Sequence, residues 1–435
     1  MDVEPPISQN LENDIFATLA GPPYAGIFRL RGGLRTGAPP HHNSVSRNIL
    51  GITARLNQMN GLSSEQIAIR DTAARYARDQ IQPWHEADES QGRFRREVVA
   101  EMGALGFWGA LVPETYDGTG TGFLSAILIT EEIAKVSPAY AGHMITQSVA
   151  VAGTILSHGS EQQKRQYIPA LIAGRTIGCF AATEPNVGSD VAAIGATALE
   201  NSDDFVLNGT KSWITNAPVA DLALVFARTA PRRSGISCFL VDLHQTRGVT
   251  VRETEKLGQR CAKVGEIFFE DTHLPKSALI GKQGKGFSTL MDLLGNTRLF
   301  AAARALGLAS TCLHASLEYA KTRSQFGVPI GNHQLIQAQL AEMYVTEQAA
   351  RTFIYKVARD KDLGTDSPMD VSAAKYFACE AAVRAAEKAM RIYGAYGYSM
   401  EYPIQRYLRD AQAMVITEGC SNIQQLIIAR HLLKA

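Results

Sequence analysis

The feature that most constrains the fold is a change of sequence texture at two points along the chain. Between Gly178 and about Ile280, short runs of β-branched and aromatic residues alternate with turn residues, which is typical of strands. Before this block the apolar residues recur at helical spacing to about Leu171, and after it they do so again. The later helical segments are expected at about 286–325, 330–362, 368–393 and 403–433. The order helices, strands, helices predicts a mainly α protein with a central β domain.

This texture divides the chain into an extension and three domains. We expect an N-terminal helical domain over 61–177, a small β-barrel-like domain over 178–285 and a C-terminal four-helix bundle over 286–435. Residues 1–60 contain proline and glycine pairs with little periodicity, which predicts a disordered or weakly ordered extension. Three origins stay open for it: native sequence, a targeting segment, or sequence upstream of a start at Met59. Order is expected to begin with a capping box formed by Ser63 and Gln66.

Composition excludes several classes of function. Lys plus Arg number 43 and Asp plus Glu number 42, so no global charge favours nucleic acid or an anionic membrane surface. No apolar run approaches the roughly 18 residues that a membrane span needs. The six cysteines are scattered without zinc or C-x-x-C spacing, which predicts free thiols in a reducing compartment and no metal site.

Two signals in the β block concern its geometry and a ligand. Asn208-Gly209 between two strand-like runs predicts a tight hairpin turn. In the run that follows, strand alternation places Trp213 and Thr215 on one face. A flat indole beside a hydroxyl suits stacking on a planar cofactor, and a partly buried strand tryptophan fits the same spacing equally well.

Three further segments combine turn residues with polar donors. The loop Phe180–Asp190 carries hydroxyls at Thr183 and Ser189 that suit a polar heterocycle or a thioester, although ordinary surface turns share this composition. Arg323 falls near the end of a predicted helix, where it suits a pyrophosphate or simply the helix dipole. Gly394 stands at another predicted helix end, which fits phosphate binding or a plain C-cap.

An acid near the C-terminus, Glu418, stands in a loop just before a predicted helix. Ser421 and Gln424 match the Ser-x-x-Gln capping box, and Gly419 lets the backbone turn sharply beside a ligand. An acid at the positive end of a helix suits a positioned general base. An exposed acid that complements the helix dipole fits the same residues.

In this order, these segments resemble the acyl-CoA dehydrogenase family, flavoproteins that desaturate acyl-CoA thioesters. The resemblance covers about residues 62–435. The matching motifs are Ala182-Thr183-Glu184-Pro185, Gly188-Ser189-Asp190, Trp213-Ile214-Thr215-Asn216, Phe269-Glu270-Asp271, Arg323-Ser324-Gln325-Phe326-Gly327, Tyr393-Gly394, Glu401-Tyr402-Pro403, Glu418-Gly419 and Ser421-Asn422-Ile423-Gln424.

The resemblance implies FAD, bound without a covalent link between the β domain and the C-terminal bundle. The residues implied in binding FAD are Phe180, Ala182, Thr183, Gly188, Ser189, Trp213, Ile214, Thr215, Arg323, Gln325, Phe326, Gln334, Arg391, Gly394, Ala395, Cys420 and Asn422. Those implied to reach the FAD of a neighbouring subunit are Arg323, Gln325, Gln334 and the stretch from Arg391 to Ala395. A site shared in this way implies a homo-oligomer, either a tetramer, which is usual in the family, or a dimer.

The resemblance also assigns the reaction partners. The residues implied to contact the acyl-CoA substrate are Ser189, Asn296, Arg298 and Gly419. Family members place the catalytic base either at the Glu-Gly position or on an inner helix before an arginine, and here the inner position is Thr297. Glu418 is therefore implied to remove the α proton while the β hydride passes to flavin N5. An electron-transferring flavoprotein is implied as the electron acceptor.

Several residues depart from the family pattern. Arg391 and Ala395 replace a glutamine and a glycine at the cofactor contact, while Thr417 and Cys420 replace other residues beside the base. Ala141 stands where the glutaryl-CoA branch has an arginine, so a dicarboxylic substrate is disfavoured. Alternatives of the same fold are an acyl-CoA oxidase and a dehydrogenase of carrier-protein thioesters, and one of another class is a flavin-free binding or structural subunit. The expected location is the cytoplasm in a bacterium and the mitochondrial matrix in a eukaryote.

Overall fold

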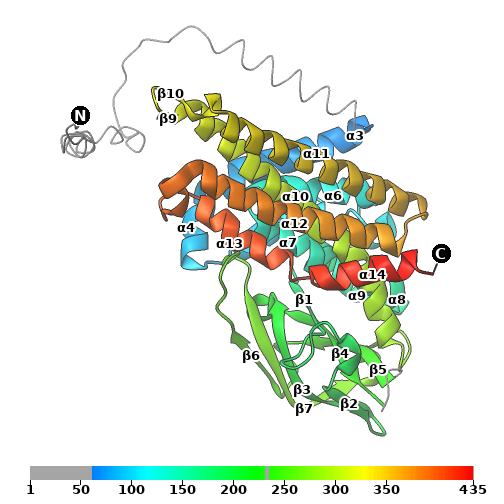
Figure 1. The fold of residues 1–435 in the computed structure, drawn as a ribbon. Coiled ribbons are helices and arrows are strands. Elements are labelled where there is room, and N and C mark those ends of the chain that lie inside the picture. The colour runs from blue at the N-terminus through cyan, green and yellow to red at the C-terminus, as the bar shows by residue number, and fades with distance from the viewer. Residues whose placement is uncertain (1–60, 231–234, 435) are drawn as a thin grey trace, which may run out of the picture. The chain divides into compact units, whose positions relative to one another are not determined.

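The computed structural model describes residues 61–230 and 235–434. The extension predicted at residues 1–60 lies outside the described residues. In chain order the described elements are a set of helices, an eight-stranded sheet and a second set of helices, as Figure 1 shows. The predicted fold class, mainly α with a central β domain, is therefore confirmed.

The N-terminal helices include one, α6 (Gly122–Val136), whose side chains are almost all buried. The others are α3 (Ser64–Tyr76), α4 (Gln82–Gln91), α5 (Arg96–Ala104), α7 (Pro138–His143), α8 (Gly153–His158) and α9 (Glu161–Ile172), with a π-helical stretch, Met144–Ala152, between α7 and α8. The predicted capping box before α3 is confirmed. The Ser63 hydroxyl accepts from the Gln66 N–H at 3.1 Å, and the Gln66 side-chain oxygen accepts from the Ser63 N–H at 3.0 Å.

The sheet has the strand order β6-β7-β3-β2-β4-β5-β8, and β1 pairs with β4. Its strands are β1 (Gly178–Ala181), β2 (Thr197–Glu200), β3 (Asp204–Thr215), β4 (Leu222–Arg228), β5 (Ile236–Asp242), β6 (Val249–Glu253), β7 (Val264–Pro275) and β8 (Leu279–Ile280). The pairs of β1 and β2 with β4 are parallel, and the other pairs in this sheet are antiparallel. Both β4 and β5 are buried almost throughout, so the core of this part lies along them.

The tight turn predicted at Asn208-Gly209 is wrong. Both residues lie inside β3, which pairs with β2 and β7, and a bulge shifts the β3–β7 register between Leu207 and Gly209. The Asn208 amide pairs across this bulge with Asp271. Its Nδ2 donates to the Asp271 carboxylate at 3.1 Å, and its Oδ1 accepts from the Asp271 N–H at 2.8 Å. Pairing with two partner strands therefore outweighs the local preference for a turn.

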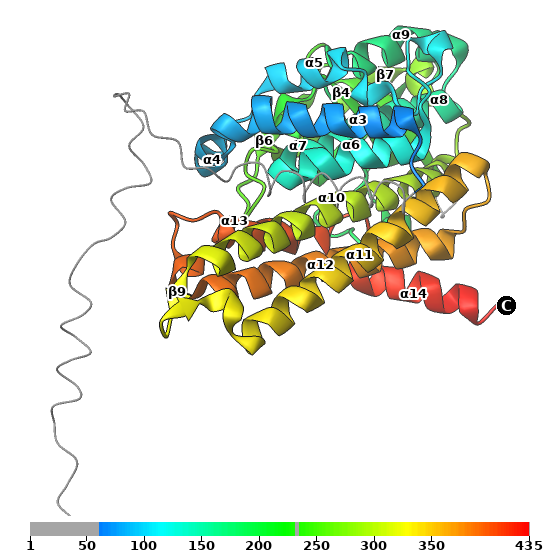
Figure 2. The same ribbon diagram turned by 90° about the horizontal axis from the view of Figure 1, so that it is seen from above.

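The central helix of the C-terminal part is α10 (Gly286–Thr322). It packs against α6 and also against α11 (Gln334–Leu363) and α12 (Pro368–Tyr393), an arrangement that Figure 2 shows from above. The predicted helical segment 403–433 is two helices, α13 (Ile404–Met414) and α14 (Ser421–Leu432). The break between them matters because it holds Glu418.

A buried ion pair ties α6 to α11. Arg351 Nη2 lies 2.8 Å from Glu131 Oε1, and the Tyr355 hydroxyl donates to the other carboxylate oxygen at 2.8 Å. Glu131 is 1% exposed, so water does not replace these partners when one is lost.

The variant Arg351→Met is expected to lower the free energy of unfolding by about 3 kcal/mol, because it leaves the Glu131 carboxylate buried without its guanidinium. The control Arg351→Lys keeps a positive charge and is expected to lose less than half as much. Urea denaturation followed by circular dichroism measures both. Equal losses in the two variants would show that packing, and not the unpaired charge, sets the cost.

Candidate active site

The loop between α13 and α14, residues 415–420, places Glu418 in an unusual backbone conformation. Glu418 has φ 57° and Gly419 has φ 85°, so two consecutive residues are left-handed. This conformation costs energy for glutamate and is natural for glycine. A Cβ on Gly419 would lie 2.8 Å from Gln424 Nε2, so a larger residue there would be strained in two ways.

Side chains from α12 and α14 hold this loop in place. Gln424 Nε2 donates to the carbonyl of Glu418 at 3.2 Å and to that of Gly419 at 2.8 Å. Lys375 Nζ donates to the same Gly419 carbonyl at 2.9 Å. Gln424 and Lys375 are both fully buried, so the loop backbone is fixed from the protein interior.

The capping box predicted for Ser421 and Gln424 is therefore wrong. Cys420 is the residue that precedes α14, and no side chain caps that helix start. The Ser421 hydroxyl donates to Glu380 Oε1 at 2.6 Å, while the Gln424 amide donates to the loop carbonyls. The residues have the spacing of a capping box, but both side chains form hydrogen bonds with tertiary partners instead.

The carboxylate of Glu418 is held by α10. Thr297 Oγ1 donates to Glu418 Oε2 at 2.5 Å, and Thr297 is fully buried. Arg298 Nε donates to the backbone carbonyl of Glu418 at 3.4 Å. The α10 position that lacks a base therefore carries a hydroxyl that orients Glu418, a role that the sequence did not suggest.

Asn296, a predicted acyl-CoA contact, lies on α10 just before this pair. Its Oδ1 accepts from Lys361 Nζ of α11 at 2.9 Å, so the amide is already oriented. The lysine also lies 2.8 Å from the Asp366 carboxylate.

The loop that follows β1 reaches the Glu418 loop. Ser189 Oγ lies 3.9 Å from Cys420 Sγ, which joins the predicted flavin loop to the loop of the predicted base. The other predicted residues in or beside these two loops are Phe180, Ala182, Thr183, Gly188 and Asn422.

A buried ion pair that was not predicted fixes the loop after β1. Lys211 Nζ in β3 lies 2.7 Å from Glu184 Oε1, and the carboxylate also accepts from the N–H groups of Gly195 and Ala196 at 2.7 and 2.9 Å. Burial lowers the pKa of Lys211 to about 8, against the opposing effect of Glu184. The two residues are 27 positions apart, a pairing that sequence spacing does not reveal.

Trp213 is an exposed aromatic residue near the end of β3. It is 62% exposed with φ 59°, whereas Ile214 is buried and Thr215 is half-buried, so the open face carries Trp213 and Thr215. Asn216 anchors the strand end, because its buried Nδ2 donates to the Gly178 carbonyl at 3.0 Å. An indole exposed on a fixed backbone offers a flat surface to a planar ring, which fits a flavin here.

The remaining predicted cofactor residues lie at the far end of α10. Arg323 directly follows this helix, about 26 residues and so about 39 Å beyond Thr297 along one axis. The stacked rings of Tyr319 and Tyr393, 3.9 Å apart, place the end of α12 beside it. This second group is Arg323, Gln325, Phe326, Gln334, Arg391, Gly394 and Ala395. The structure therefore does not bring it together with Trp213 in one subunit.

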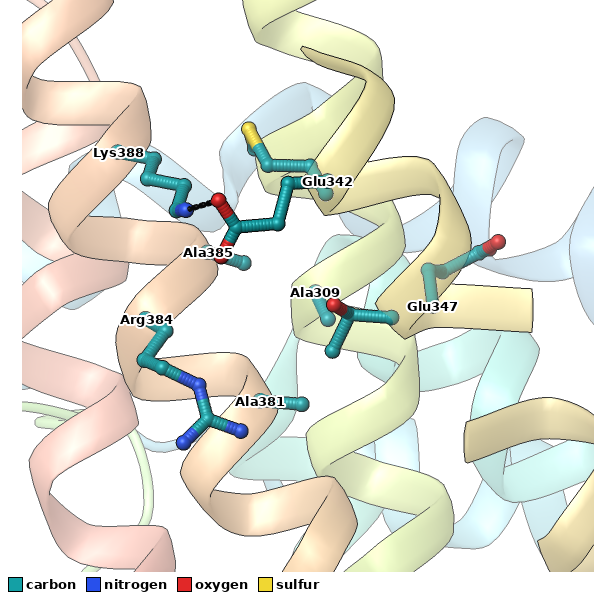
Figure 3. A pocket seen from close by; sticks show the side chains of 9 residues that line it. Ala309, Glu342, Glu347, Ala381, Arg384, Ala385 and Lys388 are labelled. Carbon is teal, nitrogen blue, oxygen red and sulfur yellow. Dashed lines mark ion pairs between the residues drawn. The ribbon is translucent and has the colours of Figure 1, made fainter. Parts of the chain in front are cut away.

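A small pocket between α10, α11 and α12 contains none of the predicted residues. Figure 3 shows its lining, where Lys388 of α12 forms an ion pair with Glu342 of α11 near Ala309 of α10. We therefore place the candidate site at the Glu418 loop and not at this pocket.

The fold and the site define a class of protein with helical parts before and after a sheet in the chain and a strained loop acid between two helices of the second part. Family models for acyl-CoA dehydrogenases match the chain as an N-terminal domain at residues 63–175, a middle domain at 179–272 and a C-terminal domain at 284–433. The chain belongs to the acyl-CoA dehydrogenase family, which consists of flavoprotein oxidoreductases.

Similar proteins cover nearly the whole described chain. A glutaryl-CoA dehydrogenase of Desulfococcus multivorans is 40% identical over 374 residues, 85% of this chain and 96% of that protein. The structure of a glutaryl-CoA dehydrogenase in complex with glutaryl-CoA has a TM-score of 0.84 at 40% identity and covers 86% of this chain and 96% of its own. A glutaryl-CoA dehydrogenase of Mycobacterium smegmatis in complex with FADH2 has a TM-score of 0.82 at 30% identity, covering 86% and 96%. The prolyl acyl carrier protein oxidase AnaB also matches, with a TM-score of 0.82 at 30% identity, covering 85% and 99%.

The described residues offer neither a candidate membrane span nor a candidate metal site. None of the helices within 61–230 and 235–434 is long and apolar enough to cross a membrane. The same residues contain no group of three or more histidines, cysteines or acids placed to hold a metal ion.

The variant Lys211→Met is expected to lower the free energy of unfolding by about 3 kcal/mol, because it leaves the Glu184 carboxylate buried without a counter-charge. The fluorescence of nearby Trp213 should change at the same time, since the loop after β1 loses its anchor. Lys282→Met, at an exposed loop lysine, is the matched control and should change neither property. Unfolding and emission like those of the wild type in Lys211→Met would show that the pair does not hold the loop.

Proposed function

We propose that this protein catalyses the α,β-dehydrogenation of an acyl-CoA thioester, with Glu418 as the base that removes the α proton. The observation that carries the proposal is the hydrogen bond from Thr297 to the Glu418 carboxylate. It orients the one acid of a strained loop, and the α10 position beside it holds no second base. FAD, when bound, supplies the acceptor for the β hydride at its N5.

The residues on the open face of β3 and in the adjoining loops fit a flavin. Trp213 offers an exposed ring for stacking, and Thr215 offers a hydroxyl on the same side. The contact between Ser189 and Cys420 joins the loop after β1 to the loop of residues 415–420. A ring bound by the first loop would therefore lie beside Glu418. The structural relatives that contain FADH2 support the same cofactor for this chain.

The backbone N–H of Glu418 suits stabilisation of the charge that develops on the thioester oxygen. No hydrogen-bond acceptor for the Glu418 N–H occurs within residues 61–230 and 235–434. With no acceptor among these residues, the donor is free for the thioester oxygen. A backbone N–H preorganised in this way stabilises an enolate-like transition state.

We propose that the second group of cofactor residues serves the FAD of a neighbouring subunit in a homo-oligomer. The separation of about 39 Å between Thr297 and Arg323 along α10 supports this proposal, because it is long for one cofactor bound within a single subunit. Large apolar side chains near Arg323 are exposed, including Phe326 at 95% and Leu335 at 81%, as an interface surface requires. A mass measurement in solution would test this, and a monomer that holds FAD would contradict it.

The electron acceptor that we propose is an electron-transferring flavoprotein. The resemblance to AnaB favours a second candidate, an oxidase of a carrier-protein thioester. Reduction with acyl-CoA, followed by a slow reaction with oxygen, distinguishes the dehydrogenase from the oxidase. A purified protein that is colourless and takes up no FAD would contradict both.

The variant Glu418→Gln is expected to bind FAD and acyl-CoA normally but to reduce the flavin at least about a thousandfold more slowly, because an amide cannot accept the α proton. Stopped-flow absorbance under anaerobic conditions measures the rate. Bleaching at a near-normal rate in this variant would show that the base is elsewhere.

The variant Thr297→Val is expected to slow flavin reduction about tenfold with little change in thioester binding, because the Glu418 carboxylate loses the donor that orients it. Thr297→Ser keeps the hydroxyl and should retain most of the rate. If valine and serine behave alike, the hydroxyl has no positioning role.

A further inference from the structure

Arg304 is a buried arginine on the same face of α10 as Thr297. The two residues are about two helical turns apart, so Arg304 lies about 10 Å further along the helix axis than Thr297. It is 7% exposed. Its Nη2 donates to Thr417 Oγ1 at 3.3 Å, and Thr417 directly precedes the base.

The partners of Arg304 are neutral and distant. Besides Thr417, its Nη1 donates to Gln259 Oε1 at 3.4 Å, and its Nε has no hydrogen-bond partner within the described part of the chain. Two other arginines with little exposure, Arg351 and Arg406, are paired with acids. Arg351 lies 2.8 Å from Glu131, and Arg406 lies 2.7 Å from Glu86. Within residues 61–230 and 235–434, Arg304 thus has no carboxylate in an ion pair of this kind.

The buried acid that contacts Gln259, Asp410, is already engaged. Asp410 lies 3.3 Å from Arg406 Nη1 and also accepts from the Gln259 N–H at 2.5 Å. Burial lowers the pKa of Arg304, and the Glu418 carboxylate opposes this effect.

The protein leaves room for the guanidinium at the inner side of the site. A Cβ on Gly142 of α7 would lie 2.8 Å from Arg304 Nη1, so this glycine is what allows the arginine to lie there. On the other side, Arg304 Nη2 contacts Thr417, an exposed residue that directly precedes Glu418. An acyl chain that extends from the base past Thr417 would reach a space bounded by this guanidinium.

We propose that Arg304 binds a carboxylate at the distal end of the acyl chain, so that the preferred substrate is a short dicarboxylic acyl-CoA. This inference rests on the proposed function. An alkyl chain that fills the space would leave a buried guanidinium without a counter-charge, which is unfavourable. A distal carboxylate would pair with it through charge-assisted hydrogen bonds and could use the unpartnered Nε. Ala141 of α7 lacks the guanidinium that the glutaryl-CoA branch has at this position. Arg304 supplies a guanidinium from α10 instead.

The test compares thioesters that differ only in the distal group. Succinyl-, glutaryl- and adipyl-CoA are each matched with the monocarboxylic thioester of equal carbon number, butyryl-, pentanoyl- and hexanoyl-CoA. Binding to the FAD-loaded enzyme is measured by calorimetry, and flavin reduction is measured by anaerobic stopped flow. At least one dicarboxylic thioester is expected to bind and react about tenfold or more better than its match.

The variant Arg304→Gln keeps neutral donors and is expected to reduce that preference about tenfold, while Arg304→Lys keeps part of it. Arg165→Gln, at an exposed arginine of α9, should keep the full preference. FAD content and thermal unfolding show that each variant is folded. A preference of the wild type for the monocarboxylic partner, or an unchanged preference in Arg304→Gln, would overturn the proposal.

Failure of the proposed function gives a different result. In that case none of the six thioesters reduces the flavin, in the wild type or in any variant. The calorimetric preference still reports on Arg304, because binding of a distal carboxylate does not need the dehydrogenation step.

Discussion

The candidate active site depends on one constraint, the left-handed turn at Glu418 and Gly419. An acid in this conformation stays there only when other groups hold the backbone, and the carbonyls of both residues accept hydrogen bonds from buried donors. With the backbone fixed by Gln424 and Lys375, a single hydroxyl from Thr297 is enough to orient the carboxylate. The flavin loop then meets this turn through Ser189.

The helix α10 sets the distances between the functional regions. Thr297 holds the Glu418 carboxylate, Arg304 stands about two turns further on, and Arg323 directly follows the helix about 39 Å beyond Thr297. Because one helix sets these positions, their separations do not depend on loops. Such a spacing fits the proposal that one chain offers one half of a cofactor site near Glu418 and the other half to a neighbour.

Sequence reasoning succeeded where local physics decides the structure. The helix–strand–helix order and the capping box at Ser63 and Gln66 both depend on neighbours in sequence, and both are present. It failed where a local signal competes with tertiary partners. Asn208-Gly209 has the composition of a turn but lies between two strands, and Gln424 has the spacing of a capping residue but binds the Glu418 loop.

The site residues that were missed share a similar cause. From the sequence, Thr297 was considered only as a position where a catalytic base is absent. The role of its hydroxyl depends on the contact between α10 and the Glu418 loop, which the fold creates. The pair of Glu184 and Lys211 joins two motifs whose types were recognised, but the contact between them comes from the sheet. Arg304 has no local signal at all, because what distinguishes it is that no carboxylate of residues 61–230 and 235–434 forms an ion pair with it.

The buried charges around Glu418 are positive. Arg298, Arg304 and Lys375 lie close to it, and burial lowers the pKa of all three, so the fold keeps three cations where water is scarce. Lys375 and Arg298 contact the loop backbone, which makes their cost part of fixing the turn. Among the described residues, Arg304 donates hydrogen bonds to Thr417 and Gln259 alone. The unfavourable burial of its charge is therefore not offset by fixing the loop backbone. A buried charge that stabilises little in the free protein is best explained by a bound state in which it has an anionic partner.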